Sequence, residues 1–193
     1  MTSRDSELTA FSPLSPRVKQ IAGNLTILGN VGFWVQLVLG IVSLMLLFFA
    51  SPLLRSTGNQ DGSKNLALFC ATLGVLILSV SIFFFFRRYI SIGKILKRGN
   101  VKERPNKKYT IRLIKLGLVS NLSGMLISLI GAEAFAGLLY GKASQIPAGA
   151  AVYNTSQLIE PVEIMALIAN VHTIFSHFAG IVIGLWLLDR VSK

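Results

Sequence analysis

Residues 20–54 read QIAGNLTILGNVGFWVQLVLGIVSLMLLFFASPLL, and this stretch contains no Lys, Arg, Asp or Glu. Three further stretches resemble it: 65–86 and 164–188 carry no charged residue, and 116–141 carries only Glu133. Each is long enough, as a helix, to cross a hydrocarbon core of roughly 30 Å. A soluble helix of this length would keep a charged face. The sequence therefore predicts an all-α integral membrane protein, a bundle of four transmembrane helices.

The expected organisation follows these charge gaps. Four spans use about half of the 193 residues, so no separate globular domain fits beside them. Residues 1–24 are expected to form a cytoplasmic N-terminal segment and 25–189 the membrane domain. The expected spans are 27–50, 66–88, 113–140 and 162–188, with a basic cytoplasmic loop at 89–112. The apolar spacing after Ser15-Pro16 suits either an interfacial helix or an extension of the first span.

The positive charges predict the orientation. Of nineteen Lys and Arg residues, eleven lie between Arg87 and Lys115, where Glu103 is the single acid. Three more precede the first span and two follow the last, which leaves three for the other two loops. Because positive loops mark the cytoplasmic side, both termini and the middle loop are expected in the cytoplasm. The net charge of +11 is thus explained without nucleic acid.

The basic loop is expected to lie on anionic lipid headgroups. Four consecutive Phe residues at 83–86 precede Arg87-Arg88-Tyr89, and an aromatic and basic boundary is typical of the membrane interface. We expect the second and third helices to extend past this boundary and to turn around 99–105. The residues expected to contact headgroups are Arg87, Arg88, Lys94, Lys97, Arg98, Lys107 and Lys108.

Small residues recur at helical spacing inside the spans. Such residues let helix backbones approach one another in lipid. They therefore predict packing within the bundle or contact between copies of the chain, with a polar pathway lined by Gln36, Asn121 and Asn170 as the alternative. The expected packing residues are Gly29, Gly32, Gln36, Gly40, Gly117, Gly124, Gly131, Gly180 and Gly184.

The fourth span carries a polar stripe. Glu163, Asn170 and His177 are spaced by seven residues, whereas His172 lies roughly 140° around the helix from His177. The two His residues therefore cannot hold one metal ion from a single helix face. They are expected either to hydrogen-bond inside the bundle or to relay protons or metal ions.

Three acids are expected near the outer interface. Glu133 lies about 27 Å along a helix from Lys115, within reach of Lys142, Lys64 or Arg55. Acids at a helix N-terminus, such as Glu160 and Glu163, are favoured as caps. Together the three could instead form an acidic mouth that concentrates cations. The candidate cation pathway is then Glu133, Glu160, Glu163, Asn170, His172 and His177.

Enzymatic signatures are missing from the sequence. It has no phosphate-binding glycine loop, no nucleophile elbow, no Cys/His zinc spacing and no dinucleotide fingerprint. The single cysteine, Cys70, allows no intrachain disulfide. We therefore expect neither an enzyme nor a cofactor.

One N-terminal signature carries a family resemblance. FSPLSPRVKQ at 11–20, followed by GNVGFWVQ at 29–36, resembles the start of a cyanobacterial and plastid family of four-span proteins. Its plant members are chloroplast inner-envelope proteins described both as an iron permease and as a 21 kDa subunit of the import translocon. The chain has no long plastid transit peptide, so the resemblance implies a cyanobacterial member in the plasma or thylakoid membrane.

Two functions follow as hypotheses. The first is a permease-like or channel-like subunit, with divalent iron as the substrate that the resemblance implies. Its carboxylates would attract and partly dehydrate the cation, and its imidazoles would accept it or exchange protons. The second is a non-transporting assembly or translocon subunit, which uses its glycine faces for helix contacts and its basic loop for lipid or a partner. Either would work as a homo-oligomer or within a membrane complex.

Overall fold

The computed structural model describes residues 15–56, 62–99, 104–145 and 158–193, and every element within them is helical. The elements are α2 (Pro16–Ser56), α3 (Gly62–Val80), a π-helical segment (Ser81–Phe86), α4 (Arg87–Arg98), α5 (Lys107–Ser144) and α6 (Pro161–Ser192). Because α3, the π-helical segment and α4 follow without a break, Gly62–Arg98 is one long helix. Four helices are thus long and apolar enough to cross a membrane, as the sequence predicted.

Helix α2 differs from its expected bounds at its C-terminal end. The first span was expected to end at residue 50, but the helix includes Pro52 and ends at Ser56. Proline removes one backbone donor, but helices of membrane proteins tolerate this where neighbouring groups satisfy the freed carbonyl. At the other end the helix begins at Pro16, so residues 16–24 extend the first span and do not form a separate helix.

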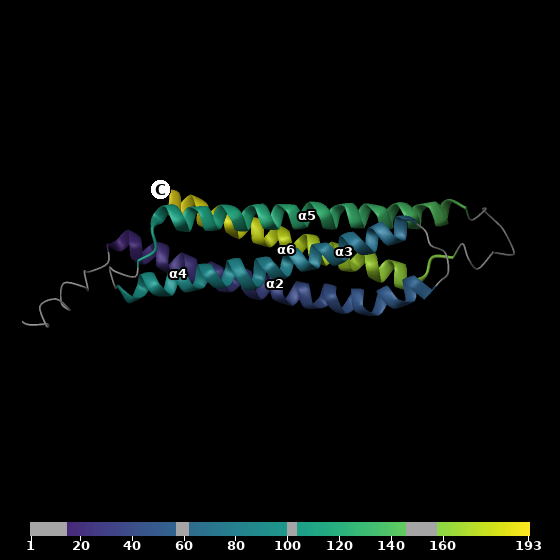
Figure 1. The fold of residues 1–193 in the computed structure, drawn as a ribbon, viewed down its shortest axis with the longest axis horizontal. Helices are drawn as coiled ribbons and strands as arrows, with labels where there is room; N and C mark the ends of the chain where they lie inside the picture. Colours follow the sequence, from purple (N-terminus) through teal and green to yellow (C-terminus); the bar gives the residue numbers. More distant parts are fainter. Residues whose placement is uncertain (1–14, 57–61, 100–103, 146–157) are drawn as a thin grey trace, which may run out of the picture.

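The long helix Gly62–Arg98 crosses the bundle diagonally. Its first part, α3, packs mainly on α5, whereas its last part, α4, packs on α2 (Figure 1). Helix α6 lies between α2 and α5 and contacts both along its length. The basic ends of the helices therefore gather at one end of the bundle, with α4 beside the start of α2 and the C-terminus near the start of α5.

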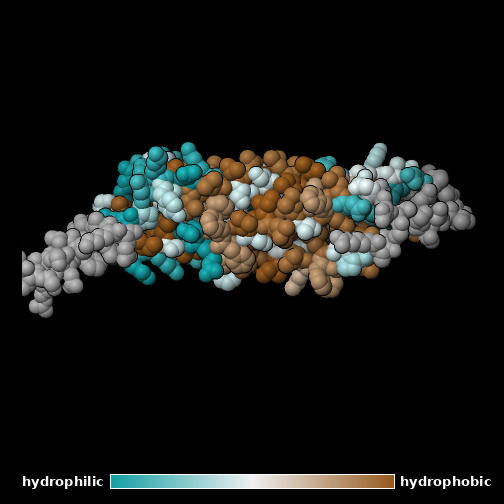
Figure 2. All heavy atoms as spheres, viewed as in Figure 1, coloured by the Kyte–Doolittle hydropathy of each residue, from teal (hydrophilic) through white to brown (hydrophobic). Residues whose placement is uncertain are grey.

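The distribution of side chains is that of a membrane protein. Large apolar side chains face outward on all four helices, for example Phe48 (71% exposed), Phe69 (64%), Val119 (60%) and Phe175 (61%). Figure 2 shows the resulting apolar band, with hydrophilic side chains concentrated at the basic end. Exposing these apolar side chains to water would cost free energy, whereas exposing them to lipid does not. The inside of the bundle can therefore hold small and polar residues.

Apolar clusters fill both ends of the bundle interior. At the basic end, Phe85, Phe86 and Tyr89 pack against Ile114 and Leu187. At the opposite end, Phe135 packs against small and aliphatic residues of α2, α3 and α6. Between these clusters lies a set of buried polar side chains, which we call the polar layer: Gln36, Ser43, Asn121, Ser128, Asn170, Thr173, Ser176 and His177.

Candidate functional site

The polar layer joins helices α2, α5 and α6 at mid-bundle. Gln36 of α2 donates from Nε2 to Asn121 Oδ1 of α5 at 2.8 Å and to the Ser176 carbonyl oxygen of α6 at 2.9 Å. Ser176 Oγ donates back to the Gln36 carbonyl oxygen at 3.3 Å. None of the three side chains is more than 1% exposed. One glutamine amide thus connects three helices that are distant in the sequence.

His177 extends this network to α3. Its Nδ1 lies 3.1 Å from Asn121 Oδ1, and its Nε2 lies 3.2 Å from the Gly74 carbonyl oxygen. A neutral imidazole has one N–H group, so it donates to only one of these oxygens at a time. The side chain is fully buried. His177 therefore links α6 either to α5, through Asn121, or to α3, through the Gly74 carbonyl.

A second contact joins α2 to α6. Ser43 Oγ lies 2.6 Å from Thr173 Oγ1, and both hydroxyls lie within 2.9 Å of the Ala169 carbonyl oxygen. Such interhelical hydrogen bonds stabilise helix association in lipid by about 0.6 kcal/mol each on average. Here these bonds mainly give hydrogen-bond partners to polar groups that the surrounding hydrocarbon cannot hydrogen-bond.

The glycines make room for these side chains. A Cβ atom added at Gly180 would overlap the Gln36 and Asn121 side chains, and one at Gly124 would overlap the His177 ring. One at Gly131 would lie 2.8 Å from Asn170 Oδ1. Gly29 and Gly32 of α2 instead face Ile90 and Phe86. The remaining predicted packing residues, Gly40, Gly117 and Gly184, face Leu78, Tyr89 and Leu118, so the glycine faces meet neighbours within the same chain.

Three oxygens in the polar layer have no hydrogen-bond partner among the described residues: Gln36 Oε1, Ser128 Oγ and Asn170 Oδ1. Asn170 uses its amide group to donate to the Ala166 carbonyl oxygen of its own helix at 3.2 Å. Unpaired buried oxygens are uncommon and indicate a place where water or a ligand could be accepted.

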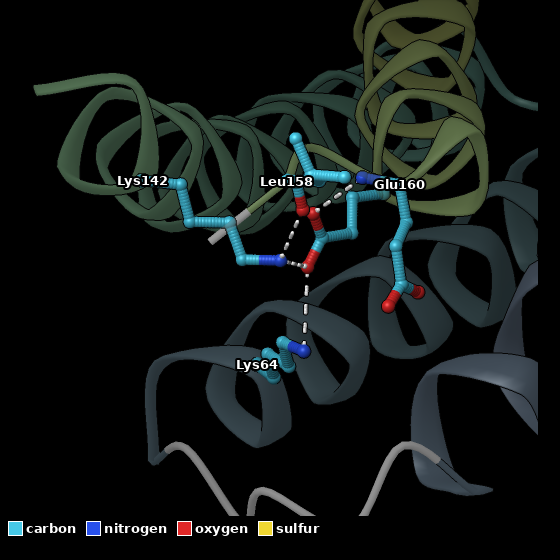
Figure 3. A network of polar contacts seen from close by, with 5 residues as sticks. Lys64, Lys142, Leu158 and Glu160 are labelled. Carbon is cyan, nitrogen blue, oxygen red and sulfur yellow. Dashed lines mark hydrogen bonds and ion pairs between the residues drawn. The ribbon is translucent and has the colours of Figure 1, made fainter. Parts of the chain in front are cut away.

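At the opposite end, a buried carboxylate holds two ammonium groups (Figure 3). Glu163 Oε1 lies 2.6 Å from Lys142 Nζ and 3.3 Å from Lys64 Nζ. Glu163 Oε2 accepts from the Glu160 backbone N–H at 3.2 Å, and Lys142 also donates to the Leu158 carbonyl oxygen. We call Lys64, Lys142 and Glu163 the ion triad. It joins the starts of α3 and α6 to the end of α5.

The other predicted pathway residues lie apart from this triad. The Glu160 side chain accepts from the Glu163 backbone N–H in a capping box, and Figure 3 draws no contact between its carboxylate and either lysine. Glu133 is exposed on α5 beside a surface pocket that Lys142 and Gln145 also line. His172 is half-buried, and its Nδ1 bonds to the Ile168 carbonyl oxygen of its own helix at 2.9 Å. Among the described residues, no group of three His, Cys, Asp or Glu side chains could hold one metal ion.

Sequence reasoning placed the stripe of Glu163, Asn170 and His177 on one helix face, and all three side chains are fully buried. It did not identify Lys64 as the partner of Glu163, nor the Gly74 carbonyl as the partner of His177. A lysine at the start of an apolar helix is usually interpreted as a charge at the membrane interface. A backbone carbonyl leaves no signal in the sequence at all.

The basic end presents the seven residues predicted to meet headgroups. Arg87, Arg88, Lys94, Lys97, Arg98, Lys107 and Lys108 are all exposed. Helix α4 ends at Arg98 and is capped by Gly99, whose φ of 75° is the left-handed conformation that glycine adopts most readily. Helix α5 starts after Asn106, whose side chain accepts from the Lys108 backbone N–H. These caps keep both basic helices folded to their ends.

The family model for proteins of unknown function DUF3611 matches residues 15–192. The chain belongs to the DUF3611 family. It is also similar to the protein TIC 21, chloroplastic, of Arabidopsis thaliana, with 30% identity over 188 residues. The match covers 94% of this chain but 61% of that protein, so this DUF3611 member spans about three fifths of its curated relative. No solved structure matches the chain. The comparisons therefore place it among multi-span membrane proteins related to TIC 21.

Proposed function

We propose that this DUF3611 protein is a non-transporting subunit of a larger membrane complex, as its relation to TIC 21 suggests. The observation that carries the proposal is the polar layer. Gln36 bonds to α5 and α6, and His177 bonds to either α3 or α5, with at most 1% exposure of Gln36, Asn121 and His177. Most of the polar groups that a conduit could use thus hold the helices together, with Gln36 Oε1, Ser128 Oγ and Asn170 Oδ1 as the exceptions among the described residues.

The ion triad supports the same proposal. A collector of cations needs a carboxylate that is open to water, whereas Glu163 is fully buried between Lys64 and Lys142. Two ammonium groups around one carboxylate leave a net positive charge, which repels an approaching cation. This end of the bundle is therefore suited to clamping three helices together.

The proposal includes an orientation. The exposed basic side chains of α4 and the start of α5 gather at the end that also holds the start of α2 and the end of α6. By the rule that positive loops stay inside, this end would face the cytoplasm of a cyanobacterial-type cell. The outward apolar faces of the four helices would then be free for lipid or for other subunits.

The test is the mass of the assembly that carries the chain in its native membrane. Full-length tagged protein would be cross-linked in the membrane, extracted in mild detergent and weighed by light scattering. We expect a protein mass well above the 21.0 kDa of one chain. A mass of one chain after efficient cross-linking would contradict the proposal. Glu133→Gln, an exposed change on α5, serves as a variant that should leave the assembly intact.

A divalent-cation permease is the second candidate, and one observation favours it. Gln36 Oε1, Ser128 Oγ and Asn170 Oδ1 are buried oxygens without a described partner, and neutral oxygens of this kind can ligate a partly dehydrated cation. Under this candidate, Fe²⁺ uptake into liposomes holding the protein should fall in Asn170→Leu. The subunit proposal expects no uptake that depends on the protein.

A further inference from the structure

A groove of about 900 Å³ lies between α2 and α4 at the basic end. The backbones of the two helices approach closely on its inner side, because Gly93 of α4 packs against Thr26 and Gly29 of α2 packs against Ile90. The groove runs along the outer side of this contact, where Figure 1 shows α4 lying against α2. It is therefore open to the lipid phase and to the headgroup region.

One part of the groove is aromatic. Phe33 and Trp34 of α2 lie edge to face with ring centroids 5.5 Å apart, and Phe83 of the π-helical segment contacts Phe33 in the same way at 6.3 Å. Trp34 is 60% exposed and Phe83 55% exposed. Phe83 precedes Arg87 by one helical turn, so these rings lie just inside the apolar band. They offer a surface that an acyl chain can cover.

The other part of the groove is basic. Arg87, Lys94 and Arg98 line it from one face of α4, over a length of about 16 Å. Asn30 of α2 and Ser91 of α4 line the same stretch and add polar groups. Within the described ranges, carboxylates pair with Lys64, Lys142 and Lys193, and not with these three side chains. The groove therefore has positive charge that the described part of the chain does not neutralise.

We propose that this groove binds an anionic lipid, with its phosphate between Arg87 and Lys94 and an acyl chain along Phe33, Trp34 and Phe83. Charge complementarity identifies the headgroup, and the aromatic part identifies the chain. A free phosphate ion would leave the rings uncovered, and an acidic protein segment would have to enter the apolar band. The proposal goes beyond general headgroup attraction, because it names one site of fixed composition, and it does not depend on the proposed function.

Native mass spectrometry of the full-length protein in neutral detergent tests the proposal. With phosphatidylglycerol and phosphatidylcholine of identical chains, we expect one saturable adduct of the anionic lipid. Arg87→Gln/Lys94→Gln should weaken this adduct roughly thirtyfold, since each of the two lost headgroup contacts removes about 1 kcal/mol. The matched control is Arg112→Gln/Lys115→Gln, which removes one Arg and one Lys charge from exposed positions of α5 that do not line the groove. It should leave the adduct unchanged.

Fluorescence tests the position of the chain independently of those variants. The protein has two tryptophans, so Trp186→Phe leaves Trp34 as the only one. Phosphatidylglycerol with brominated chains should quench Trp34 at the concentrations that form the adduct, and brominated phosphatidylcholine should not. Equal losses in both charge variants, equal quenching by both lipids, or displacement of the lipid by millimolar inorganic phosphate would each overturn the proposal.

Discussion

Among the single side chains on which this bundle depends, Glu163 is the clearest case. Its carboxylate is fully buried and is the counter-charge of both Lys64 and Lys142, which are themselves largely buried. Removing one partner of a buried ion pair leaves uncompensated charge in a medium of low dielectric constant. The ion triad is therefore a point at which the fold should be sensitive to a single change.

We expect Glu163→Gln to lower the free energy of unfolding by about 3 kcal/mol, because two ammonium groups lose their carboxylate. Unfolding in mixed detergent and SDS micelles measures the loss. Glu160→Gln is the matched control at the same helix start, and its effect should be much smaller. Adding Lys142→Gln to Glu163→Gln should restore part of the stability. A Glu163 variant as stable as the Glu160 variant would rule out the triad as a clamp.

Gly180 is a second residue whose replacement should be costly. We expect Gly180→Ala to destabilise the protein by about 1–3 kcal/mol, because the new Cβ overlaps the Gln36 and Asn121 side chains in a packed interior. Gly137→Ala on α5 is the control, since a Cβ there meets nothing within 4 Å and alanine favours the helix. Unfolding in the same micelles separates the two variants. Equal stability of both would mean that the polar layer is loosely packed.

The helices themselves were easier to predict than the contacts between them. The charge gaps gave four spans because a 20-residue window without charge has few alternatives in any fold. The diagonal course of Gly62–Arg98 was not predictable, because it depends on which glycines meet which side chains across helices. Gly93, which lets α4 approach α2, lies in the helical extension that the sequence predicted, but the sequence does not show which helix it meets.

The candidate site residues were likewise predictable from the sequence only in part. The stripe of Glu163, Asn170 and His177 follows from helical periodicity alone. Whether a stripe is a pathway or a contact surface depends on the opposing helices, and single-sequence patterns do not contain that information. Cross-helix acceptors such as the Asn121 side chain and the Gly74 carbonyl appear only when the helices are packed.

The packing of α2 on α6 can be tested with pairs of introduced cysteines. In a Cys70→Ser background, Ser43→Cys/Thr173→Cys should form a disulfide on mild oxidation, because the native hydroxyl oxygens lie 2.6 Å apart. Val42→Cys/Thr173→Cys is the control, since Val42 faces outward from α2. Gel mobility after cleavage at a protease site inserted between the helices detects the link. Equal linking of both pairs would contradict the packing of α2 on α6.

Considered whole, the molecule has an asymmetric distribution of charge that predicts its orientation. We expect single cysteines replacing Lys97 and Lys193, in the Cys70→Ser background, to resist a membrane-impermeant maleimide in intact spheroplasts. Gln145→Cys should react without permeabilisation, because Gln145 is exposed at the opposite end. Labelling after permeabilisation is the control for accessibility. Reaction of the Lys97 position in intact cells would reverse the proposed topology.

We propose that the polar interior of this DUF3611 protein joins helices and does not conduct ions. The most direct measurement is Fe²⁺ uptake into proteoliposomes that contain the purified protein alone, with folding and orientation verified and an ionophore as positive control. The comparison variant is Glu133→Gln/His172→Ala, because Glu133 is exposed and the His172 ring bonds within its own helix. We expect Fe²⁺ uptake by wild type and variant alike to match that of empty liposomes. Uptake that requires the protein would contradict this, and a fall in the variant would assign the pathway to Glu133 and His172.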